Sequence, residues 1–598
     1  MSVTRIIAIV WNHRAPHSTA DVEALRAGVM QASAAWAPCW EEPGLVVFAR
    51  TDAPAPSNIP FEGTCGVLYG RAFRSGGAAP VSAADIAIDA LVGSSGASLF
   101  QTIWGSYLAF VRDHDGAATF VVRDPSGAMP CFMAKRGWAF VFFTDRRDVT
   151  ALALSKWTVN WDYLLRRVKN NRTAGDGTGF EEIEELPPGA IARVGQGRRS
   201  VKLAWDPEAF AAANLSDANE AARRLRTAVV SSCAGFASNY DRIGVKLSGG
   251  LDSTIVLSAL AMTGAQIAAL NLVTPTSEGD ERVFARQSAA RAGAFLTESI
   301  RHPESVDLRA AIVHAPCVRP HLWLLNSEAA ALEAAHARAQ GIDIYFTGRG
   351  GDNVFGRSVS PHALADCLID RGDVAAFLQR AWAYAEAQGE TYGAVLRDVA
   401  GLIWRHAVQR RPLLQDDGDD VRFLSEKARA LIGERAAFQP QARLLPGKQV
   451  HLAAIADRLN YFESDADPPH VHPLVAQPVL EASLSIAAEV LSPFCSDRGL
   501  ARRAFAGDIP PEILARRSKG RTNSYATRVL INNLGFLRSF LLHGALEGAG
   551  MVEHQALDFA LSEGALLRDG ALATPIVSLL NVEAWLRCCA VGARGATG

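Results

Sequence analysis

The sequence is poor in the features that mark several large classes of protein. Its 598 residues include only nine cysteines, and no two of them form a CxxC pair. Thiols this few and this scattered exclude a disulfide scaffold and are typical of a reduced, cytoplasmic protein. Lys and Arg number 60 and Asp and Glu number 62, so the formal net charge is −2. Without a basic excess, the chain is not expected to bind nucleic acid.

Signals for export or membrane insertion are also scarce. The N-terminal sequence MSVTRIIAIVW has no long apolar core with a cleavage site, so we predict no signal peptide. Residues 253–277 carry no charge and are long enough to raise the question of a membrane span. They include Gln266, Asn271 and Pro275, however, and fit better a buried helix, a tight turn and a buried strand. We therefore expect no membrane partner and a cytoplasmic location.

The composition is that of a large globular protein, with 49% hydrophobic and 20% charged residues. The part up to residue 205 is predicted to be rich in β-structure. Apolar runs separated by turn signals predict strands at 5–10, 44–49, 106–111, 118–122 and 138–143, and residues 81–92 predict a helix.

The pattern changes after residue 205. A helix is predicted at 218–234, and beyond it strand and helix patterns alternate. The strands are predicted at 243–247, 267–273, 294–300 and 342–347, and the helices between them at 253–261, 280–292 and 326–340. Such alternation is typical of a doubly wound parallel sheet. Beyond residue 360 the chain is predicted to be mostly helical, with a charged, mobile stretch at 415–420. We therefore divide the chain into domains at 1–205 and 206–598.

The strongest local signal follows the predicted strand at 243–247. It reads Ser248-Gly249-Gly250-Leu251-Asp252-Ser253 and leads directly into a helix. The glycines let backbone N–H groups approach an anion, and the helix N-terminus adds its positive dipole. The serine hydroxyls can donate to phosphate oxygens, and Asp252 can hold a Mg²⁺ ion that bridges phosphates. The GxxxxGK[ST] pattern of a Walker loop is absent. The strand–loop–helix context favours a phosphate loop over a turn that binds nothing.

Two further signals follow along the chain. A second glycine loop, Gly348-Arg349-Gly350-Gly351-Asp352, comes directly after the predicted strand at 342–347. Because neighbouring parallel strands end at the same rim, we expect Asp252 and Asp352 to face one metal ion. A basic segment at 498–520 includes Lys519. Basic residues near a nucleotide neutralise phosphate charge in a transition state, although alone such a segment is more typical of a solvated face.

These three segments, in this order and spacing, resemble the asparagine synthetase family of ATP pyrophosphatases. The resemblance covers most of residues 205–598 and reaches the N-terminal part through the turn at 123–130 and the Leu-Pro-Pro-Gly sequence at 186–189. It implies an N-terminal αββα domain of the Ntn glutaminase type, then a doubly wound ATP-pyrophosphatase domain with a helical C-terminal part.

The resemblance also implies site residues. The ATP phosphates would be held by Ser248, Gly249, Gly250, Asp252 and Ser253. The adenosine would be lined by Leu247, by Leu272 or Val273, and by Thr347 and Gly348. Asp252 and Asp352 would bind Mg²⁺, and Lys519 would stabilise the negative charge that develops at the adenylate.

The sequence departs from the family's glutaminase pattern. Glutamine-dependent members carry a cysteine directly after the initiator Met, whereas here the residue is Ser2 and the first cysteine is Cys39. The family's NGxIYN stretch has no counterpart, since residues 66–70 lack both asparagines. We expect an N-terminal domain that keeps the fold without glutaminase activity. Ser2 as a nucleophile activated by its own amine is the alternative.

A second departure lies in the second glycine loop. Asparagine synthetases carry Glu in the place of Arg349 and usually at Asn353, and β-lactam synthetases carry Tyr in the place of Arg349. Arginine stays protonated and cannot act as a base, but it suits an anionic group such as a substrate carboxylate. We therefore assign Arg349 and Asn353 to substrate binding.

The resemblance is closest to lasso-peptide macrolactam cyclases. It implies that ATP and Mg²⁺ serve to adenylate an Asp or Glu side chain of a processed precursor peptide, and that the peptide's N-terminal amine then closes an isopeptide ring. It also implies a leader protease and a peptide-recognition protein as partners. A β-lactam or carbapenam synthetase, another amide ligase and a non-catalytic nucleotide-binding scaffold are the alternatives. The base is left open among His321, His470 and His472. The pair of histidines at 470 and 472 is predicted to lie in a loop, with too few ligands for a metal site.

Overall fold

The computed structural model describes residues 5–14, 18–51, 57–113, 115–148, 157–170, 177–274, 276, 279–312, 317–320, 324–356, 360–409, 421–433, 443–456, 468–493, 496–516 and 523–595. The stretch at 415–420, expected to be mobile, lies outside these residues.

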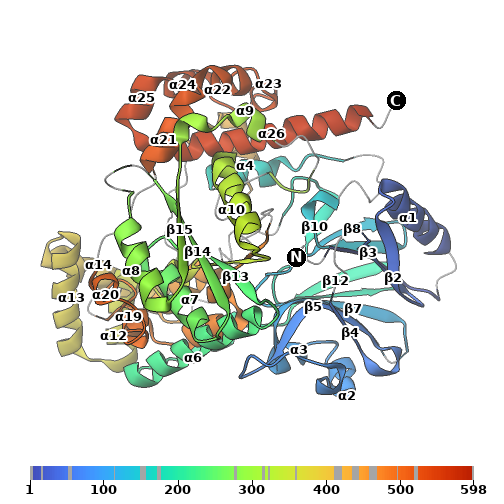
Figure 1. Ribbon diagram of the computed structural model, residues 1–598, viewed down its shortest axis with the longest axis horizontal. Coiled ribbons are helices and arrows are strands. Elements are labelled where there is room, and N and C mark those ends of the chain that lie inside the picture. Colours follow the sequence, from blue (N-terminus) through green and yellow to red (C-terminus); the bar gives the residue numbers. More distant parts are fainter. Residues whose placement is uncertain are drawn as a thin grey trace.

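The N-terminal part contains two six-stranded antiparallel sheets (Figure 1). One has the order β10-β8-β9-β1-β3-β2 and the other β12-β11-β7-β6-β5-β4. The strands are β1 (Ile6–Trp11), β2 (Trp36–Glu42), β3 (Leu45–Arg50), β4 (Asn58–Pro60), β5 (Gly66–Arg74), β6 (Ile103–Arg112), β7 (Ala118–Arg123), β8 (Phe132–Arg136), β9 (Ala139–Phe143), β10 (Ile183–Glu185), β11 (Ala190–Gly195) and β12 (Arg198–Leu203).

The two sheets face each other, and helices cover their outer faces. In β1, Ile6, Ala8 and Val10 point into the core between the sheets, while Ile7 and Ile9 pack toward the helices on the other side. Burial on both faces explains why the strands read as unbroken apolar runs instead of alternating. The covering helices are α1 (Ser18–Ala32), α2 (Ile88–Gly93), α3 (Leu99–Thr102) and α4 (Trp161–Lys169). These layers form the predicted helix–sheet–sheet–helix arrangement.

The helix predicted at 81–92 is only partly correct. A single 3₁₀ turn spans Ala83–Asp85, and α2 begins at Ile88. The Asp85 carboxylate accepts a hydrogen bond from the Ser82 backbone N–H (2.8 Å), which closes the first turn on itself. Ile86 then adopts an extended backbone, so the turn does not continue into a helix.

The C-terminal part is built on a parallel sheet with the order β15-β14-β13-β16-β17. Its strands are β13 (Arg242–Lys246), β14 (Gln266–Val273), β15 (Phe295–Ile300), β16 (Tyr345–Thr347) and β17 (His470–Val471). The alternation read from the sequence is thus correct, but β17 replaces the loop predicted around the two histidines. It is a two-residue edge strand whose pairing partner lies 125 residues away, so no local pattern indicates it.

Helices lie on both faces of this sheet and beyond it (Figure 1). Those near the sheet are α5 (Pro207–Ala212), α6 (Ala218–Ala237), α7 (Leu251–Ala261), α8 (Arg282–Ala292), α9 (Leu308–Ala311), α10 (Ser327–Gln340) and α11 (Gly351–Val354). Those that follow are α12 (Pro361–Arg371), α13 (Val374–Gln388), α14 (Tyr392–Trp404), α15 (Glu426–Leu431), α16 (Pro446–Ala456), α17 (Gln477–Ser485), α18 (Ala488–Leu491), α19 (Gly499–Ala504), α20 (Pro511–Ala515), α21 (Asn523–Asn532), α22 (Leu534–Leu541), α23 (Ala545–Gly548), α24 (His554–Ala560), α25 (Glu563–Arg568) and α26 (Ala573–Gly595).

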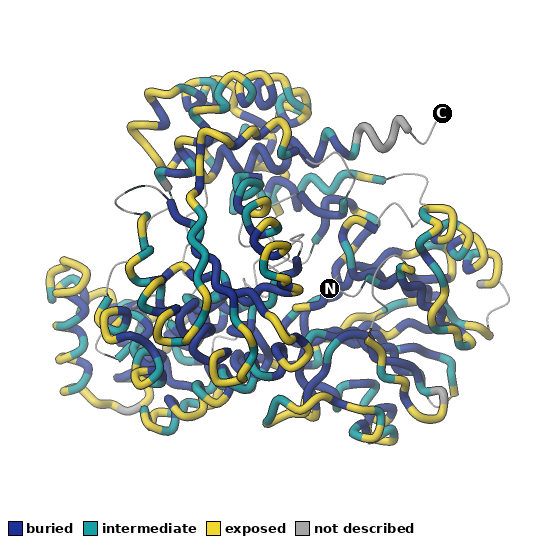
Figure 2. Tube along the Cα trace, viewed as in Figure 1, coloured by how far each residue is buried: buried dark blue, intermediate teal, exposed yellow. Residues whose placement is uncertain are grey.

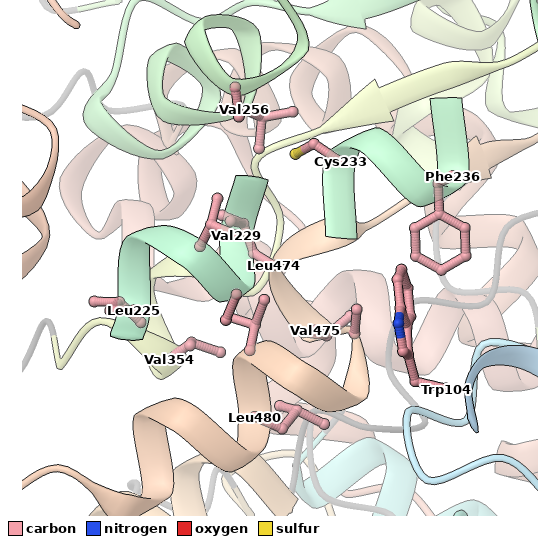
Figure 3. Packing of buried hydrophobic residues seen from close by; sticks show 14 of the residues in the cluster. Trp104, Leu225, Val229, Cys233, Phe236, Val256, Val354, Leu474, Val475 and Leu480 are labelled. Atoms are coloured by element: carbon pink, nitrogen blue, oxygen red, sulfur yellow. The ribbon is translucent and has the colours of Figure 1, made fainter. Parts of the chain in front are cut away.

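The core is continuous between the two parts, as the buried stretches in Figure 2 indicate. Figure 3 shows Trp104 of β6 beside Phe236 of α6, and their ring centroids are 5.4 Å apart at 88°. Edge-to-face packing of this kind adds to the stabilisation from burial. The outer face of the second sheet is therefore buried against α6 of the C-terminal part.

One finding bears on membranes. Among the described helices, no single one is long and apolar enough to cross a bilayer. The helices at 524–532 and 534–548 would together be long and apolar enough, by length and composition only, but they are bent by 77° relative to each other.

Candidate active site

The two glycine loops meet at the point where the strand order of the parallel sheet reverses. Strand β13 has β14 on one side and β16 on the other, so the loops after β13 and β16 are neighbours. A Cβ atom added to Gly348 would lie 2.5 Å from the Ser253 nitrogen, so only glycine lets the second loop approach the start of α7 this closely. Ligands of doubly wound sheets bind in the crevice at such a switch point.

The first loop has the geometry of an anion cradle. Gly249 has a φ of +80°, and a Cβ there would lie 2.9 Å from the Ala285 nitrogen of α8. Gly250 caps the N-terminus of the eleven-residue helix α7. The Ser248 and Ser253 hydroxyl oxygens are 3.1 Å apart, and the Gly250 N–H donates to the Ser248 hydroxyl (3.2 Å). A bound phosphate would meet donors here together with the positive end of a helix dipole.

Asp252 and Asp352 converge on a single point, which a guanidinium nitrogen of Arg498 occupies. Its Nη1 lies 2.7 Å from Asp252 Oδ2 and 3.0 Å from Asp352 Oδ1. Its Nη2 lies 2.7 Å from Asp497 Oδ2. Burial opposes the charge of Arg498, but the carboxylates of Asp252 and Asp497 outweigh it and raise the pKa of Arg498. Because both aspartates already bind one cation, their placement fits the predicted shared metal.

The donor set matches magnesium chemistry. Mg²⁺ prefers oxygen ligands and is usually held by one or two carboxylates together with substrate phosphates. Within the described part of the chain, no group of three or more His, Cys, Asp or Glu side chains is arranged to hold a metal. The two aspartates therefore suit an ion whose other ligands come from a nucleotide.

The basic segment packs against the first loop. Arg502 donates to the carbonyls of Leu514 (2.7 Å) and Arg516 (2.9 Å), which fixes the end of α20. Arg516 in turn pairs with Glu281 at 2.6 Å, beside the loop glycine Gly249. Lys519 lies outside the described residues, three positions beyond this anchored arginine.

The residues expected to line adenosine come from the ends of three neighbouring strands, β14, β13 and β16. Leu247, which directly precedes the first glycine loop, is buried in the core that includes α7. Leu272 packs beside the small cluster under α10, whereas Val273, its neighbour along the strand, points to the opposite face. Thr347 is buried, with its hydroxyl 2.7 Å from His472 Nδ1, and Gly348 is half-buried at the loop contact.

The two residues assigned to substrate binding differ in placement. Arg349 is half-buried. Burial is the main cause that lowers the pKa values of Lys246 and His470, and the positive charge of Arg349 contributes to lowering both. Its backbone N–H donates to the Thr347 hydroxyl (3.2 Å). Asn353 instead donates its side-chain amide to the Ala454 carbonyl (3.0 Å), so it ties α11 to α16.

A buried charged group that sequence reasoning missed lies beside Arg349. Glu333 of α10 contacts Lys246 Nζ at the end of β13, and its other oxygen lies 2.8 Å from His470 Nε2. Burial opposes the ionisation of Glu333, but these two contacts prevail and lower its pKa to about 2. A usable signal exists, since Ala329, Glu333 and Ala337 are spaced by four and form the buried stripe of α10. Of the three candidate bases, His470 and His472 lie here, and His321 lies outside the described residues.

The described residues of the N-terminal part include only part of the family's glutaminase pattern. Ser2 lies outside them, and residues 66–70 belong to β5. Arg123, whose side chain is 1% exposed, pairs with Glu185 at 2.8 Å, and Glu185 also contacts Arg319. The family-like turn that begins at Arg123 thus joins the two parts of the chain through a buried ion network.

Two solved structures are similar to part of the chain. One is titled the structure of the allosteric regulatory enzyme of purine biosynthesis, with 10% identity and a TM-score of 0.20, over 57% of this chain and 83% of that one. The other is glutamine phosphoribosylpyrophosphate (PRPP) amidotransferase from B. subtilis complexed with ADP and GMP, with 12% identity and a TM-score of 0.18, over 57% of this chain and 90% of that one. TM-scores this low support no further conclusion. No curated protein matches the chain.

The family model described as asparagine synthase matches residues 224–587, which is more than half of the chain and includes both glycine loops. Members of this family use ATP, generally with Mg²⁺, and form AMP as they join carbon to nitrogen. The chain therefore belongs to the asparagine synthase family and is an ATP-dependent, AMP-forming carbon–nitrogen ligase.

Proposed function

We propose that this ligase is a lasso-peptide cyclase. It adenylates an Asp or Glu side-chain carboxylate of a processed precursor peptide, and the peptide's own N-terminal amine displaces AMP to close a macrolactam. Pyrophosphate leaves in the first step and AMP in the second. The observation that carries the proposal is the position of Arg349 in the second glycine loop, next to Gly348, which lies against the start of α7.

The nucleotide half of the reaction depends on the two loops. The first loop would bind the phosphates through Ser248, Gly249, Gly250 and Ser253. Asp252 and Asp352 would hold Mg²⁺, which when bound neutralises phosphate charge and favours loss of pyrophosphate. Lys519 would stabilise negative charge at the adenylate. Lys519→Ala is expected to slow the chemical step about 10²-fold with little change in ATP affinity, as single-turnover kinetics would measure.

The acceptor half depends on charge. Arg349, with Lys246 nearby, offers positive charge to an incoming carboxylate and can bind it with paired hydrogen bonds. A guanidinium cannot accept a proton, which disfavours a role in handling ammonia. If the site attracts a carboxylate and no ammonia is supplied by a glutaminase, the substrate must carry both the carboxylate and the amine.

The amine is expected to come from the peptide itself. Position 2 is Ser where glutamine-dependent members have their nucleophilic cysteine. Holding a prefolded peptide with its amine against the adenylate is an orientation effect worth about 7–11 kcal/mol in favourable cases. A leader protease and a peptide-recognition protein would supply the processed peptide. As part of this proposal, residues 1–205 form a degenerate glutaminase-like domain and residues 206–598 form the ligase domain.

The test is mass spectrometry of peptides incubated with the protein, ATP and Mg²⁺. A peptide with a free N-terminal amine and an Asp or Glu several residues on should lose one water, while AMP and pyrophosphate accumulate. An N-acetylated copy of the same peptide is the matched control and should keep its mass. An unchanged mass for all free-amine peptides made with the cognate protease would contradict the proposal and favour a β-lactam or carbapenam synthetase or another amide ligase. ADP instead of AMP would contradict the adenylation step itself.

A separate assay tests the amine source. Neither glutamine nor ammonium is expected to support amide formation on aspartate with ATP. Asparagine formed under these conditions would show that the N-terminal domain, or an ammonia site, is functional.

A further inference from the structure

Arg498 is held in its position by an unusual backbone. It precedes α19 with a φ of +52°, a left-handed conformation that residues other than glycine seldom adopt. The residue is only 6% exposed. Its Nε and Nη2 are bound to the neighbouring Asp497 at 3.1 and 2.7 Å, which leaves Nη1 to reach the two loops. The local structure thus directs one N–H group between Asp252 and Asp352.

The charges around this point are nearly balanced. Three carboxylates, from Asp252, Asp352 and Asp497, surround the Arg498 guanidinium, and Arg502 lies 3.6 Å from Asp497. A divalent cation added to this arrangement would meet a positive charge already bound to both of its ligands. ATP phosphates change that balance, because they bring negative charge and strong acceptors for a guanidinium.

We propose that Arg498 is the resident counter-ion of Asp252 and Asp352 and prevents a divalent cation from binding until the nucleotide arrives. In the free protein it pairs with one oxygen of each carboxylate and links the two loops. When nucleotide binds, its phosphates accept hydrogen bonds from Arg498 and release the aspartates for the metal. Arg498 is therefore a positioning residue, and metal and nucleotide bind as a coupled pair. The inference rests on the proposed nucleotide site, but not on the nature of the acceptor.

The test is Mn²⁺ binding to the full-length protein, measured by electron paramagnetic resonance without any turnover. We expect wild-type protein to bind Mn²⁺ about 10-fold or more weakly without nucleotide than with a non-hydrolysable ATP analogue. Arg498→Met removes the charge and keeps much of the side-chain volume. It should bind Mn²⁺ without nucleotide about 10-fold or more tightly than wild type, because nothing then competes for the two aspartates.

Two variants serve as controls. Arg503→Met makes the same change within α19, which Arg498 precedes, but Arg503 is exposed and contacts Asn219 away from the site, so Mn²⁺ binding should stay as in wild type. Arg498→Lys keeps the positive charge, so this variant should still bind Mn²⁺ weakly in the absence of nucleotide. Thermal unfolding checks that each variant is folded, and Arg498→Gln replaces the Met variant if that one does not fold.

Several outcomes would overturn the inference. One is wild-type protein that binds Mn²⁺ equally well with and without the analogue; another is a folded, charge-free variant that gains no binding. If the Mn²⁺ affinities of wild type and variants are as expected but no peptide is cyclised, only the proposed cyclase reaction would be contradicted.

Discussion

Two buried aspartates that follow strand ends, one in each part of the molecule, show two different uses of the same side chain. Asp124 comes directly after β7 and accepts hydrogen bonds from its own turn, from the Ser126 hydroxyl and from the N–H groups of Ala128 (3.3 Å) and Met129 (3.2 Å). Asp252, in the first turn of α7, is bonded to Arg498, 246 residues away. A carboxylate that is satisfied within five residues shapes its turn. One that is paired with a distant cation marks a place where charged groups from separate elements meet, which is what binding a charged ligand requires.

The comparison extends to the sheets that carry these residues. The N-terminal sheets are antiparallel, so neighbouring strands such as β2 and β3, or β8 and β9, can be joined by short turns. The parallel sheet needs long crossovers, so the carboxyl ends of β13 and β16 lie side by side and open toward the same crevice. The difference in topology thus accounts for the difference in what each aspartate can do.

The largest expected effect comes from the aspartates of the parallel sheet. Asp252→Asn or Asp352→Asn should lower AMP formation by about 10³-fold or more, because a neutral amide neither balances a metal charge nor replaces a carboxylate ligand. The fold should persist with a lower unfolding temperature, because the buried Arg498 loses one of its charged partners. Pyrophosphate release and calorimetry measure the two properties. Near-full turnover in either variant would show that the two-aspartate site is wrong.

The next effect concerns Glu333, which is buried like Asp124 but bound to distant partners like Asp252. Its folded-state pKa of about 2 lies below the ordinary value of 4.5, so its ionised form stabilises the fold above pH 4.5. Glu333→Gln should therefore lower the free energy of unfolding by about 3 kcal/mol at pH 7. The difference from wild type should shrink as the pH falls from 4.5 toward 2.

Urea unfolding at several pH values measures this difference, with the exposed Glu563→Gln on α25 as the control. A gap between wild type and Glu333→Gln that stays constant between pH 7 and pH 3 would contradict the assignment.

A moderate effect on stability is expected from the turn aspartate. Asp124→Asn replaces an acceptor by an NH₂ group that faces backbone donors, and it should lower the free energy of unfolding by about 1–3 kcal/mol. The rate of AMP formation per folded molecule should stay unchanged. Chemical unfolding together with a turnover assay tests both. A large loss of turnover with unchanged stability would remove the distinction between the two kinds of aspartate.

The smallest effect is expected where the loops touch. Gly348→Ala places a methyl group against the backbone of Ser253 and should push the loops apart, weakening nucleotide binding by about 10-fold. Gly401→Ala on α14 has open space around it and is the matched control. Isothermal titration with an ATP analogue measures the affinities, and equal values for the two variants would mean that the contact between the loops is unimportant.

The sequence predicted the features that depend on local chemistry. Apolar periodicity located most strands and the helix–strand alternation, and the spacing of glycines, serines and aspartates located both loops. The sequence-based prediction was wrong where two local signals conflict or where a segment is too short to show a pattern. The Ser82–Asp85 turn interrupts what reads as one helix, and β17 is too short to have a pattern. The pairing of Lys246 with Glu333 could not be predicted from the sequence, because the two residues lie in different elements 87 residues apart.

By itself, therefore, the sequence determined the family, the two glycine loops and the aspartates in them, since turns and helix starts are encoded by neighbouring residues. Only the tertiary structure decided which groups those aspartates meet. The contact of Arg498 with Asp252 and Asp352 spans 246 and 146 residues, and the contact of Glu333 with His470 spans 137. Hydrogen bonds and ion pairs act over a few ångströms in space, and strand order in a parallel sheet, which no short segment encodes, sets those distances.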